Sequence, residues 1–204
     1  CARFEADNSV GLAPERALND NNRLFRAGCA RLGWAAEQFP INVRGCRGCG
    51  LCNLGCSNGA KQGTNRVQLP RAERGGVEVV TRCEVEAIDG RGDAPVLTAR
   101  VRAPAPGAIG AASPWAPGEY VIRARAVVVA AGAVGSPALL LRSRLPARLP
   151  RLGRGFTCHP AVIVVAEHVH PITNAVGHPK SFYVDRAAEE GFVVTPRVGL
   201  DWQR

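Results

Sequence analysis

The sequence AVVVAAGAVGSPALLLRS, residues 126–143, decides the fold class. Its first part is a continuous run of small and β-branched apolar residues, which is typical of a strand buried on both faces of an α/β sheet. The run ends in Ala130, Ala131, Gly132 and Ala133, and a helix-compatible apolar segment follows. A strand, a turn of small residues and a helix start allow the phosphates of a dinucleotide to approach backbone amides. We therefore predict an α/β unit in which these four residues contact a bound nucleotide.

The segments before this stretch favour a β-hairpin. Residues 83–88, 94–101 and 120–125 are rich in alternating apolar residues and predict three strands, with the turn residues 89–93 between the first two. The second and third strands are expected to pair around a long loop that is rich in proline and glycine.

Other elements are predicted from periodicity and caps. Apolar residues at helical spacing predict a helix over residues 19–31, capped by Asp20 or Asn21 and ended near Gly33. Residues 65–74 predict a short helix that leads into a strand at 77–80.

The C-terminal part favours β-structure. Residues 161–169 predict another strand, and the last forty residues predict further strands and loops.

Composition and charge limit the function classes. The 204 residues are 46% hydrophobic and 21% charged, as in folded globular proteins. The formal net charge is +9, but the arginines are scattered and aromatic residues are few, so we expect no nucleic-acid partner. No apolar run approaches the length of about 20 residues that spans a bilayer, and we expect a cytoplasmic protein or one peripheral to a membrane. The sequence begins with Cys1 and contains no methionine, so we expect a piece of a longer chain.

A cysteine-rich loop is predicted at residues 45–63. Cys46, Cys49, Cys52 and Cys56 have the spacing of the bacterial ferredoxin run that binds iron–sulfur clusters, although Ser57 stands where proline usually follows. Three interpretations remain open: ligands of an iron–sulfur cluster, a zinc or disulfide staple, or reduced structural thiols. A loop of this length without regular structure is uncommon unless it is cross-linked or functional, so we expect some of these cysteines to be joined.

Several segments, taken in chain order, resemble one family. Residues 132–143 resemble the second signature of the glucose-methanol-choline (GMC) oxidoreductases, with Arg144 in place of the usual following glycine. Residues 55–64 are similar to a loop in the long-chain alcohol oxidase and cholesterol oxidase branch. Residues 77–88 resemble the paired strands whose backbone contacts the adenine of FAD in this family. Residues 153–160 resemble the family's Gly-Arg-Asn-Leu-x-Asp-His-Pro segment, with glycine in place of asparagine and cysteine in place of aspartate.

This resemblance implies an FAD-dependent oxidoreductase that oxidises the CH–OH group of a small-molecule alcohol, with an unknown electron acceptor. It implies that the backbone of Val85 contacts the adenine of FAD. Residues 1–156 are expected to supply part of a Rossmann-like FAD-binding domain, and residues 157–204 to begin an antiparallel substrate-binding sheet. An iron–sulfur electron-transfer module built on the cysteine loop is the alternative function.

Two features of the family are not found in this sequence. The Gly-x-Gly-x-x-Gly turn is absent, and none of the histidines, His159, His168, His170 and His178, stands in the context of the family's catalytic base. We therefore assign no catalytic residue and expect the chain by itself to be inactive towards alcohols.

Overall fold

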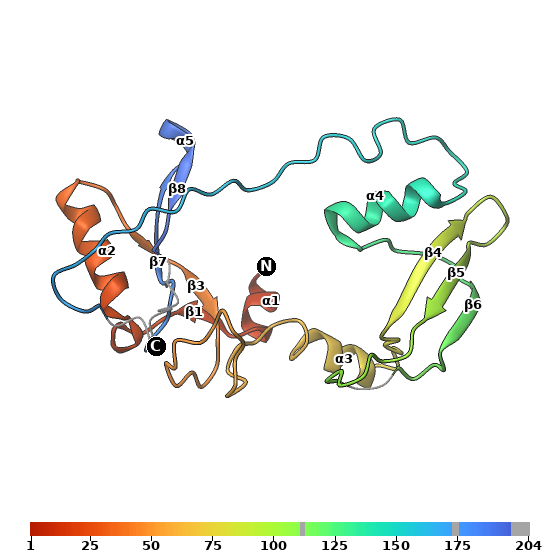
Figure 1. The fold of residues 1–204 in the computed structure, drawn as a ribbon, viewed down its shortest axis with the longest axis horizontal. Helices are drawn as coiled ribbons and strands as arrows, with labels where there is room; N and C mark the ends of the chain where they lie inside the picture. Colours follow the sequence, from red (N-terminus) through yellow and green to blue (C-terminus); the bar gives the residue numbers. More distant parts are fainter. Residues whose placement is uncertain (111–112, 173–175, 197–204) are drawn as a thin grey trace. The chain divides into compact units, whose positions relative to one another are not determined.

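The computed structural model describes residues 1–110, 113–172 and 176–196. The chain forms two compact units, one made of Cys1–Val77 with Val165–Arg204 and the other of Glu78–Val164. Each unit combines helices with antiparallel strands, and all pairings between the named strands are antiparallel (Figure 1). The predicted α/β class, in which helices combine with sheets, is therefore confirmed.

The first unit contains two small sheets and short helices. Its elements, in chain order, are α1 (Ala2–Asp7), β1 (Val10–Leu12), a 3-10 helix (Glu15–Ala17), α2 (Asp20–Arg31), β2 (Glu37–Gln38), β3 (Pro40–Asn42), α3 (Gln68–Arg74), β7 (Phe182–Arg186), α5 (Ala187–Glu190) and β8 (Phe192–Val194). Strand β1 pairs with β3, and the second sheet has the order β2-β7-β8. The strands expected near the C-terminus are thus present up to residue 196, and the rest of that prediction, residues 197–204, lies outside the described residues.

Helix α2 confirms the helix predicted over residues 19–31, with a different cap. The side chain of Asn19 accepts a hydrogen bond from the amide of Asn22, so Asn19 is the cap and the prediction of Asp20 or Asn21 was wrong. The chain leaves the helix at Gly33, which has a φ of +71° and so takes the left-handed conformation that glycine adopts readily. The predicted end is therefore confirmed.

A small apolar core and a buried polar side chain hold α2 against the strand β7. Ala13, Leu18 and Phe182 form the buried cluster. Asn22 is fully buried and donates to the carbonyl oxygen of His178, while its own side-chain oxygen accepts from the amide of Ser181. These two bonds join segments that are more than 150 residues apart in the sequence.

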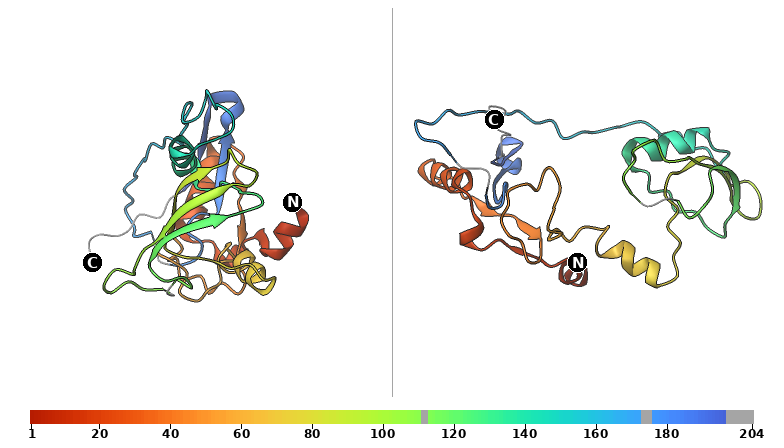
Figure 2. Two further views of the ribbon diagram at one scale, coloured as in Figure 1. Left: turned by 90° about the vertical axis from the view of Figure 1, so that its right-hand side faces the viewer. Right: turned by 60° about the horizontal axis from the view of Figure 1, so that its bottom comes forward.

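The second unit is a three-stranded sheet with one helix packed on it. Strands β4 (Cys83–Asp89), β5 (Val96–Val101) and β6 (Gly118–Arg123) lie side by side, and α4 (Gly132–Arg142) packs against β4 (Figure 2). Ile88, Leu97 and Leu139 form the buried cluster between the sheet and the helix. The predicted strands and the hairpin of the second and third strands are confirmed, with shifts of a few residues at the ends.

The strand predicted over residues 126–133 is wrong. Residues 126–130 are extended but pair with no other strand in the described part of the chain, and α4 already begins at Gly132. Val127 and Val129 pack on the core, whereas the side chain of Val128 is 90% exposed. A run of valines satisfies the composition of a buried strand, but strand formation also requires neighbours that share its backbone hydrogen bonds.

Two further strand predictions are wrong. Residues 77–80 form no strand, because the chain turns at Arg82, whose φ is +56°, before β4 begins. Residues 161–169 are extended without a strand partner, and Val162 is 93% exposed. Both segments have the apolar, β-branched composition of strands but lack pairing in the described residues.

Within the described residues, every helix is too short or too polar to cross a membrane.

Candidate functional site

The start of α4 leaves its backbone open. Ala131 is the N-cap residue and makes no side-chain hydrogen bond to the helix, and the first turn contains no acidic residue. Gly132 has a φ of +79°, and nothing lies within 4 Å of the position that a Cβ atom would occupy there. Ala130, Ala131, Gly132 and Ala133 are all exposed. The first amides of an 11-residue helix are therefore accessible to an anionic group.

The other end of α4 is fixed to the edge of the sheet. The hydroxyl of Ser143 donates to the carbonyl oxygen of Leu139 at 2.7 Å and accepts from the amide of Ile88 at 2.9 Å. The next residue, Arg144, exchanges backbone hydrogen bonds with β4 and the turn after it, donating to Ile88 at 2.8 Å and accepting from Gly90 at 2.9 Å. The segment with the family-like signature is thus held in register with β4 by its final serine.

Val85 lies on this same strand, at an edge of the sheet. Among the described residues, the strand order β4-β5-β6 leaves one side of β4 without a neighbouring strand, and only the β-bridge between Asp89 and Arg144 lies at its end. The pairing with β5 shifts between Val85 and Ala87, which marks a β-bulge, and the carbonyl oxygen of Glu86 accepts from the guanidinium of Arg142 at 3.3 Å. Bulges at sheet edges are frequent next to ligand sites, because they redirect the backbone locally.

Val85 and the segment that leads into α4 pack on the same apolar core. Val85, Val127 and Val129 all pack against the cluster of Ile88, Leu97 and Leu139. Within the described residues, no hydrogen bond joins Val85 to a group outside the β4–β5 ladder. The second unit therefore combines an exposed helix start with an open strand edge.

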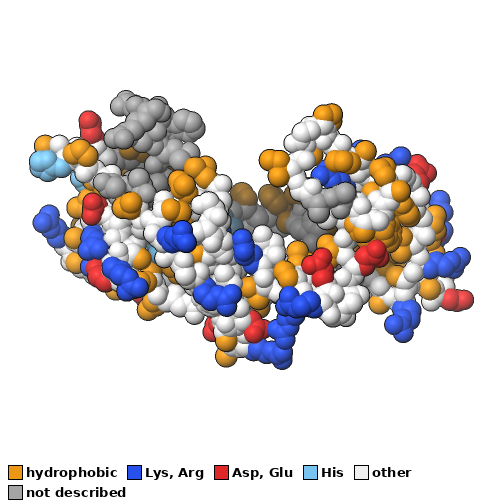
Figure 3. Space-filling view, turned by 90° about the horizontal axis from the view of Figure 1, so that it is seen from below, with side chains coloured by type: hydrophobic (Ala, Val, Ile, Leu, Met, Phe, Trp, Pro, Cys, Tyr) orange, Lys and Arg blue, Asp and Glu red, His pale blue; other side chains and the backbone are white. Residues whose placement is uncertain are grey.

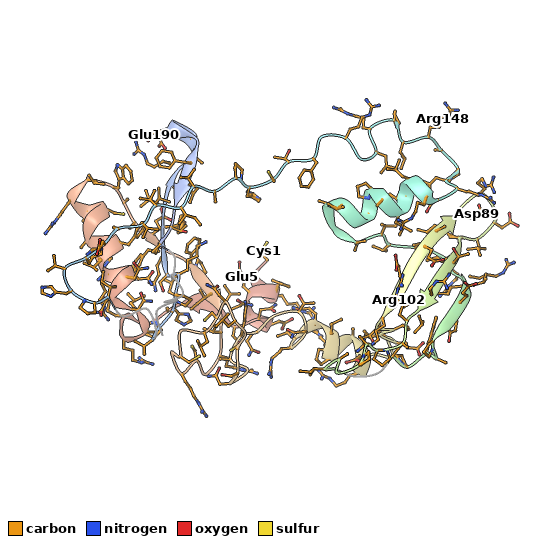
Figure 4. The ribbon with its side chains drawn as sticks, viewed as in Figure 1. Cys1, Glu5, Asp89, Arg102, Arg148 and Glu190 are labelled. Atoms are coloured by element: carbon orange, nitrogen blue, oxygen red, sulfur yellow. The ribbon has the colours of Figure 1, made fainter. Side chains whose placement is uncertain are left out.

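Charged side chains on this sheet are mostly paired. Glu84 bonds Arg102 at 2.6 Å, and Glu86 and Glu119 both bond Arg100. A hydrogen bond from the guanidinium of Arg91 lowers the pKa of Asp89 to about 2. Figure 4 shows Asp89 and Arg102 at opposite ends of the β4–β5 pair.

These ion pairs engage Arg100 and Arg102, so part of the positive charge of the second unit is paired with carboxylates. On the face seen in Figure 3, the Lys and Arg side chains lie at several separate places.

The four cysteines line one cavity in the first unit. Cys46, Cys49, Cys52 and Cys56 all contribute to a cavity of about 210 Å³, together with Lys61 and other residues. All four are free thiols. The amide of Lys61 donates to the sulfur of Cys56 at 3.3 Å, and the amide of Gly48 donates to the sulfur of Cys46 at 3.4 Å.

This geometry does not support an iron–sulfur cluster, which was one of the three interpretations that the cysteine spacing left open. Within residues 1–110, 113–172 and 176–196, no three His, Cys, Asp or Glu side chains are arranged so that they could hold a metal ion. Ferredoxin spacing along the chain is not sufficient, because ligands must also converge on one point. The alternative function as an iron–sulfur electron-transfer module therefore has no support from the structure.

His178 is a feature of the cavity that sequence analysis did not single out. His178 is only 5% exposed and lines the cavity beside the cysteines. This burial lowers the pKa of its imidazole. Its position depends on Asn22, which bonds its carbonyl oxygen at 2.9 Å. No local pattern in the sequence indicates a contact between residues so far apart.

The other histidines lie in other segments of the chain. His168 and His170 line a shallow groove beside α2 in the first unit, and His159 is exposed in an extended segment of the second unit. The structure therefore gives no reason to assign a catalytic base to any of them.

Comparisons with known proteins identify the family of the chain. The profile of the GMC oxidoreductase family matches residues 9–161. An uncharacterised GMC-type oxidoreductase of Mycobacterium tuberculosis is 35% identical over 162 residues, which cover 78% of this chain and 24% of that protein. A long-chain-alcohol oxidase of Arabidopsis thaliana, FAO4A, is 32% identical over 143 residues, which cover 70% of this chain and 18% of the oxidase.

The match over residues 9–161 covers most of the chain and places it in a family of oxidoreductases. More particularly, the chain belongs to the GMC oxidoreductase family, whose N-terminal domain is its Rossmann-like, FAD-binding region. The chain spans about a quarter of the length of the mycobacterial relatives and 18% of the length of the plant enzyme. No solved structure matches the chain significantly.

Proposed function

We propose that this chain forms part of an FAD-dependent oxidoreductase that acts on the CH–OH group of an alcohol. The observation that carries the proposal is the segment 132–143: it has the GMC signature, forms α4, and is fixed to the strand that carries Val85. Family membership implies FAD. Bound FAD would supply the acceptor for the hydride that leaves the carbon bearing the hydroxyl group.

The residues present fit one end of this cofactor. The exposed amides at the start of α4 provide donors for an anionic part of FAD, and the small side chains of residues 130–133 leave the space that such an approach requires. The backbone at Val85 provides an open strand edge for the adenine ring. In this proposal, the chain binds and orients the nucleotide end of FAD.

The domain division follows the same proposal. Residues 1–156 would supply part of the FAD-binding domain, including the cysteine-rich loop at 45–63, and residues 157–204 would begin the substrate-binding part. The antiparallel pairing of β7 with β8 is consistent with a substrate-binding sheet in the second of these regions.

The substrate class is proposed from relatives. Three plant proteins named long-chain-alcohol oxidases are 29–32% identical over 70–85% of the chain. We propose a primary alcohol with an alkyl chain as the substrate, with the electron acceptor left open.

Replacement of Gly132 tests the cofactor site. In the natural full-length protein, Gly132→Val places a branched side chain at the start of α4, and flavin content is expected to fall at least about tenfold, equivalent to a loss of about 1.4 kcal/mol in binding. Gly107→Val is the matched control, because Gly107 has a φ of +74°, close to the +79° of Gly132, and also has open space around its Cβ position. Normal flavin content in Gly132→Val, measured by absorbance of the released cofactor, would show that the helix start does not contact FAD.

A further inference from the structure

Both lysines of the chain line the cysteine cavity. Of the 26 Lys and Arg residues only Lys61 and Lys180 are lysines, and both belong to the cavity wall in the first unit. Neither forms an ion pair with a carboxylate of the described residues. The cavity thus has two ammonium groups for which the described part of the chain supplies no carboxylate partner.

The segments that build the cavity contain no acidic residue. The lining residues come from 41–61 and 177–180. The sequence has 17 Asp and Glu residues, but none of them occurs in residues 38–72 or 168–184. Residues 38–72 contain five Lys and Arg residues instead. Positive charges gathered without negative ones raise the local potential, so this region attracts anions.

Buried hydrogen bonds fix the backbone around Lys180. The side chain of Asn22 donates to the carbonyl oxygen of His178 at 2.9 Å and accepts from the amide of Ser181 at 2.8 Å, so the chain is held on both sides of Lys180. The ammonium nitrogen of Lys180 lies 5.2 Å from the centroid of the Phe39 ring. A side chain that is already positioned loses less conformational entropy when it binds a ligand.

The backbone of Lys61 is also held in place. Lys61 forms an antiparallel β-bridge with Val43, and its amide donates to the sulfur of Cys56 at 3.3 Å. Burial raises the pKa of the Cys52 thiol, as do the neighbouring thiols, whereas the positive charge of Lys61 lowers it. The ammonium group of Lys61 therefore acts on the thiols of the cavity wall.

The rest of the cavity wall is suited to an apolar group. Ile41, Val43, Ala60 and Pro179 line it together with the four cysteines, and free cysteine behaves as a small apolar residue. The cavity has a volume of about 210 Å³. An apolar cavity of about 150 Å³ accommodates benzene. The wall therefore favours an organic anion over phosphate or sulfate, which would leave its apolar side chains without contacts.

We propose that the cysteine cavity binds a small organic carboxylate, whose charge is balanced by Lys61 and Lys180 and whose apolar body contacts the remaining wall. A molecule bound there covers the cysteines and shields their sulfurs from reagents in solvent. The proposal does not depend on the proposed alcohol oxidation, because Val85 and residues 130–133, which we assign to FAD, lie in the second unit.

Alkylation of the cavity thiols tests this site in the natural full-length protein. The reduced protein is treated briefly with N-ethylmaleimide, an uncharged reagent, in the presence of benzoate, its uncharged analogue benzamide, or inorganic phosphate. Sodium chloride keeps the ionic strength constant. After denaturation, the remaining thiols are labelled with a heavy form of the reagent, and mass spectrometry of the tryptic peptide 48–61 gives the alkylated fraction of its three cysteines. In Lys61→Gln the corresponding peptide is 48–66.

Two cysteines outside the cavity are internal controls. The exposed Cys158 should react at the same rate with and without benzoate. The buried Cys29 should stay unreactive as long as the first unit is folded, so it reports the folding of each variant. Rates with and without ligand are compared within one variant, so that a change in the intrinsic reactivity of a thiol cancels.

Benzoate should slow alkylation of the cavity thiols until the effect saturates. We expect half-saturation at about 0.1–10 mM, as for a ligand of this size. Benzamide should require at least about tenfold more, because it lacks the charge, and phosphate should not protect. Lys61→Gln and Lys180→Gln should each raise the half-saturating concentration of benzoate at least about fivefold. The matched control Arg74→Gln removes an exposed cation of the same unit outside the cavity and should change it by less than about twofold.

The remaining outcomes overturn the proposal. Equal protection by benzoate and benzamide would make the cavity an apolar site that needs no charge. Protection by phosphate as strong as that by benzoate would make it a site for inorganic anions. No protection by benzoate, or protection that is unchanged in both lysine variants, would show that the two lysines bind no carboxylate.

Discussion

Replacement of Ser143 by alanine should loosen the attachment of α4 to the sheet. The hydroxyl accepts from the amide of Ile88 at 2.9 Å and donates to the carbonyl oxygen of Leu139 at 2.7 Å, and Ile88 belongs to the buried cluster of this unit. The substitution removes both bonds and leaves the amide of Ile88 without its acceptor. An unsatisfied, largely buried donor costs about 1–3 kcal/mol.

The amide of Ile88 reports this loss directly. Because about 1.4 kcal/mol corresponds to a factor of ten in an equilibrium constant, hydrogen exchange at Ile88 should accelerate by about 5-fold to 150-fold. Exchange is measured by NMR, residue by residue, so that events in the first unit do not obscure the result. Amides of β6 should change much less, because they lie in the strand farthest from α4 in the sheet order.

Two variants control this experiment. Ser136→Ala removes a hydroxyl from the same helix at a partly buried position, and it should leave exchange at Ile88 within about twofold, as expected for a substitution that breaks no buried bond. Ser143→Thr keeps a hydroxyl and should restore most of the protection. Exchange at Ile88 that is equally slow in Ser143→Ala and in the unsubstituted protein would refute the assigned role of Ser143.

Two other predictions concern the first unit. Asn22→Ala should destabilise it by about 2–4 kcal/mol, because the carbonyl of His178 and the amide of Ser181 lose their buried partner, whereas the exposed Asn53→Ala should have little effect in urea unfolding. Burial lowers the pKa of His178 from its usual value near 6.5, so as the pH falls below about 6.5 the unfolded chain takes up a proton before the folded one does. The free energy of unfolding should therefore be highest above this pH and should decrease below it. The decrease is at most about 1.4 kcal/mol per pH unit and ends where the pH reaches the pKa of His178 in the folded protein. His178→Gln should remove this slope and His159→Gln, at an exposed position, should not; an unchanged slope in His178→Gln would assign it to other groups.

The elements that local pattern determines were predictable. Helix α2 has apolar residues at helical spacing, and Gly33 marks its end, while β5 and β6 alternate apolar and polar residues around a loop rich in proline and glycine. The signature at 132–143 identified the family, because it depends on residue identities in sequence order. These features need no knowledge of distant parts of the chain.

The features that depend on distant partners were not predictable. The run at 126–130 has the composition of a buried strand, but a strand forms only where another strand supplies hydrogen bonds, and sequence alone does not show that partner. Likewise, the contact of Asn22 with residues 178 and 181 joins segments about 160 residues apart, and neither segment has a local signal for it. The cysteine spacing indicated proximity along the chain but not whether the sulfurs converge in space.

Spectroscopy of the natural full-length protein tests the central claim most directly. The proposed function predicts a yellow protein with the two visible bands of an oxidised flavin, which releases about one FAD per chain on denaturation. Addition of a long-chain primary alcohol without oxygen should bleach these bands, because the substrate reduces the bound flavin. A protein that folds but contains no flavin and binds no added FAD would contradict the account.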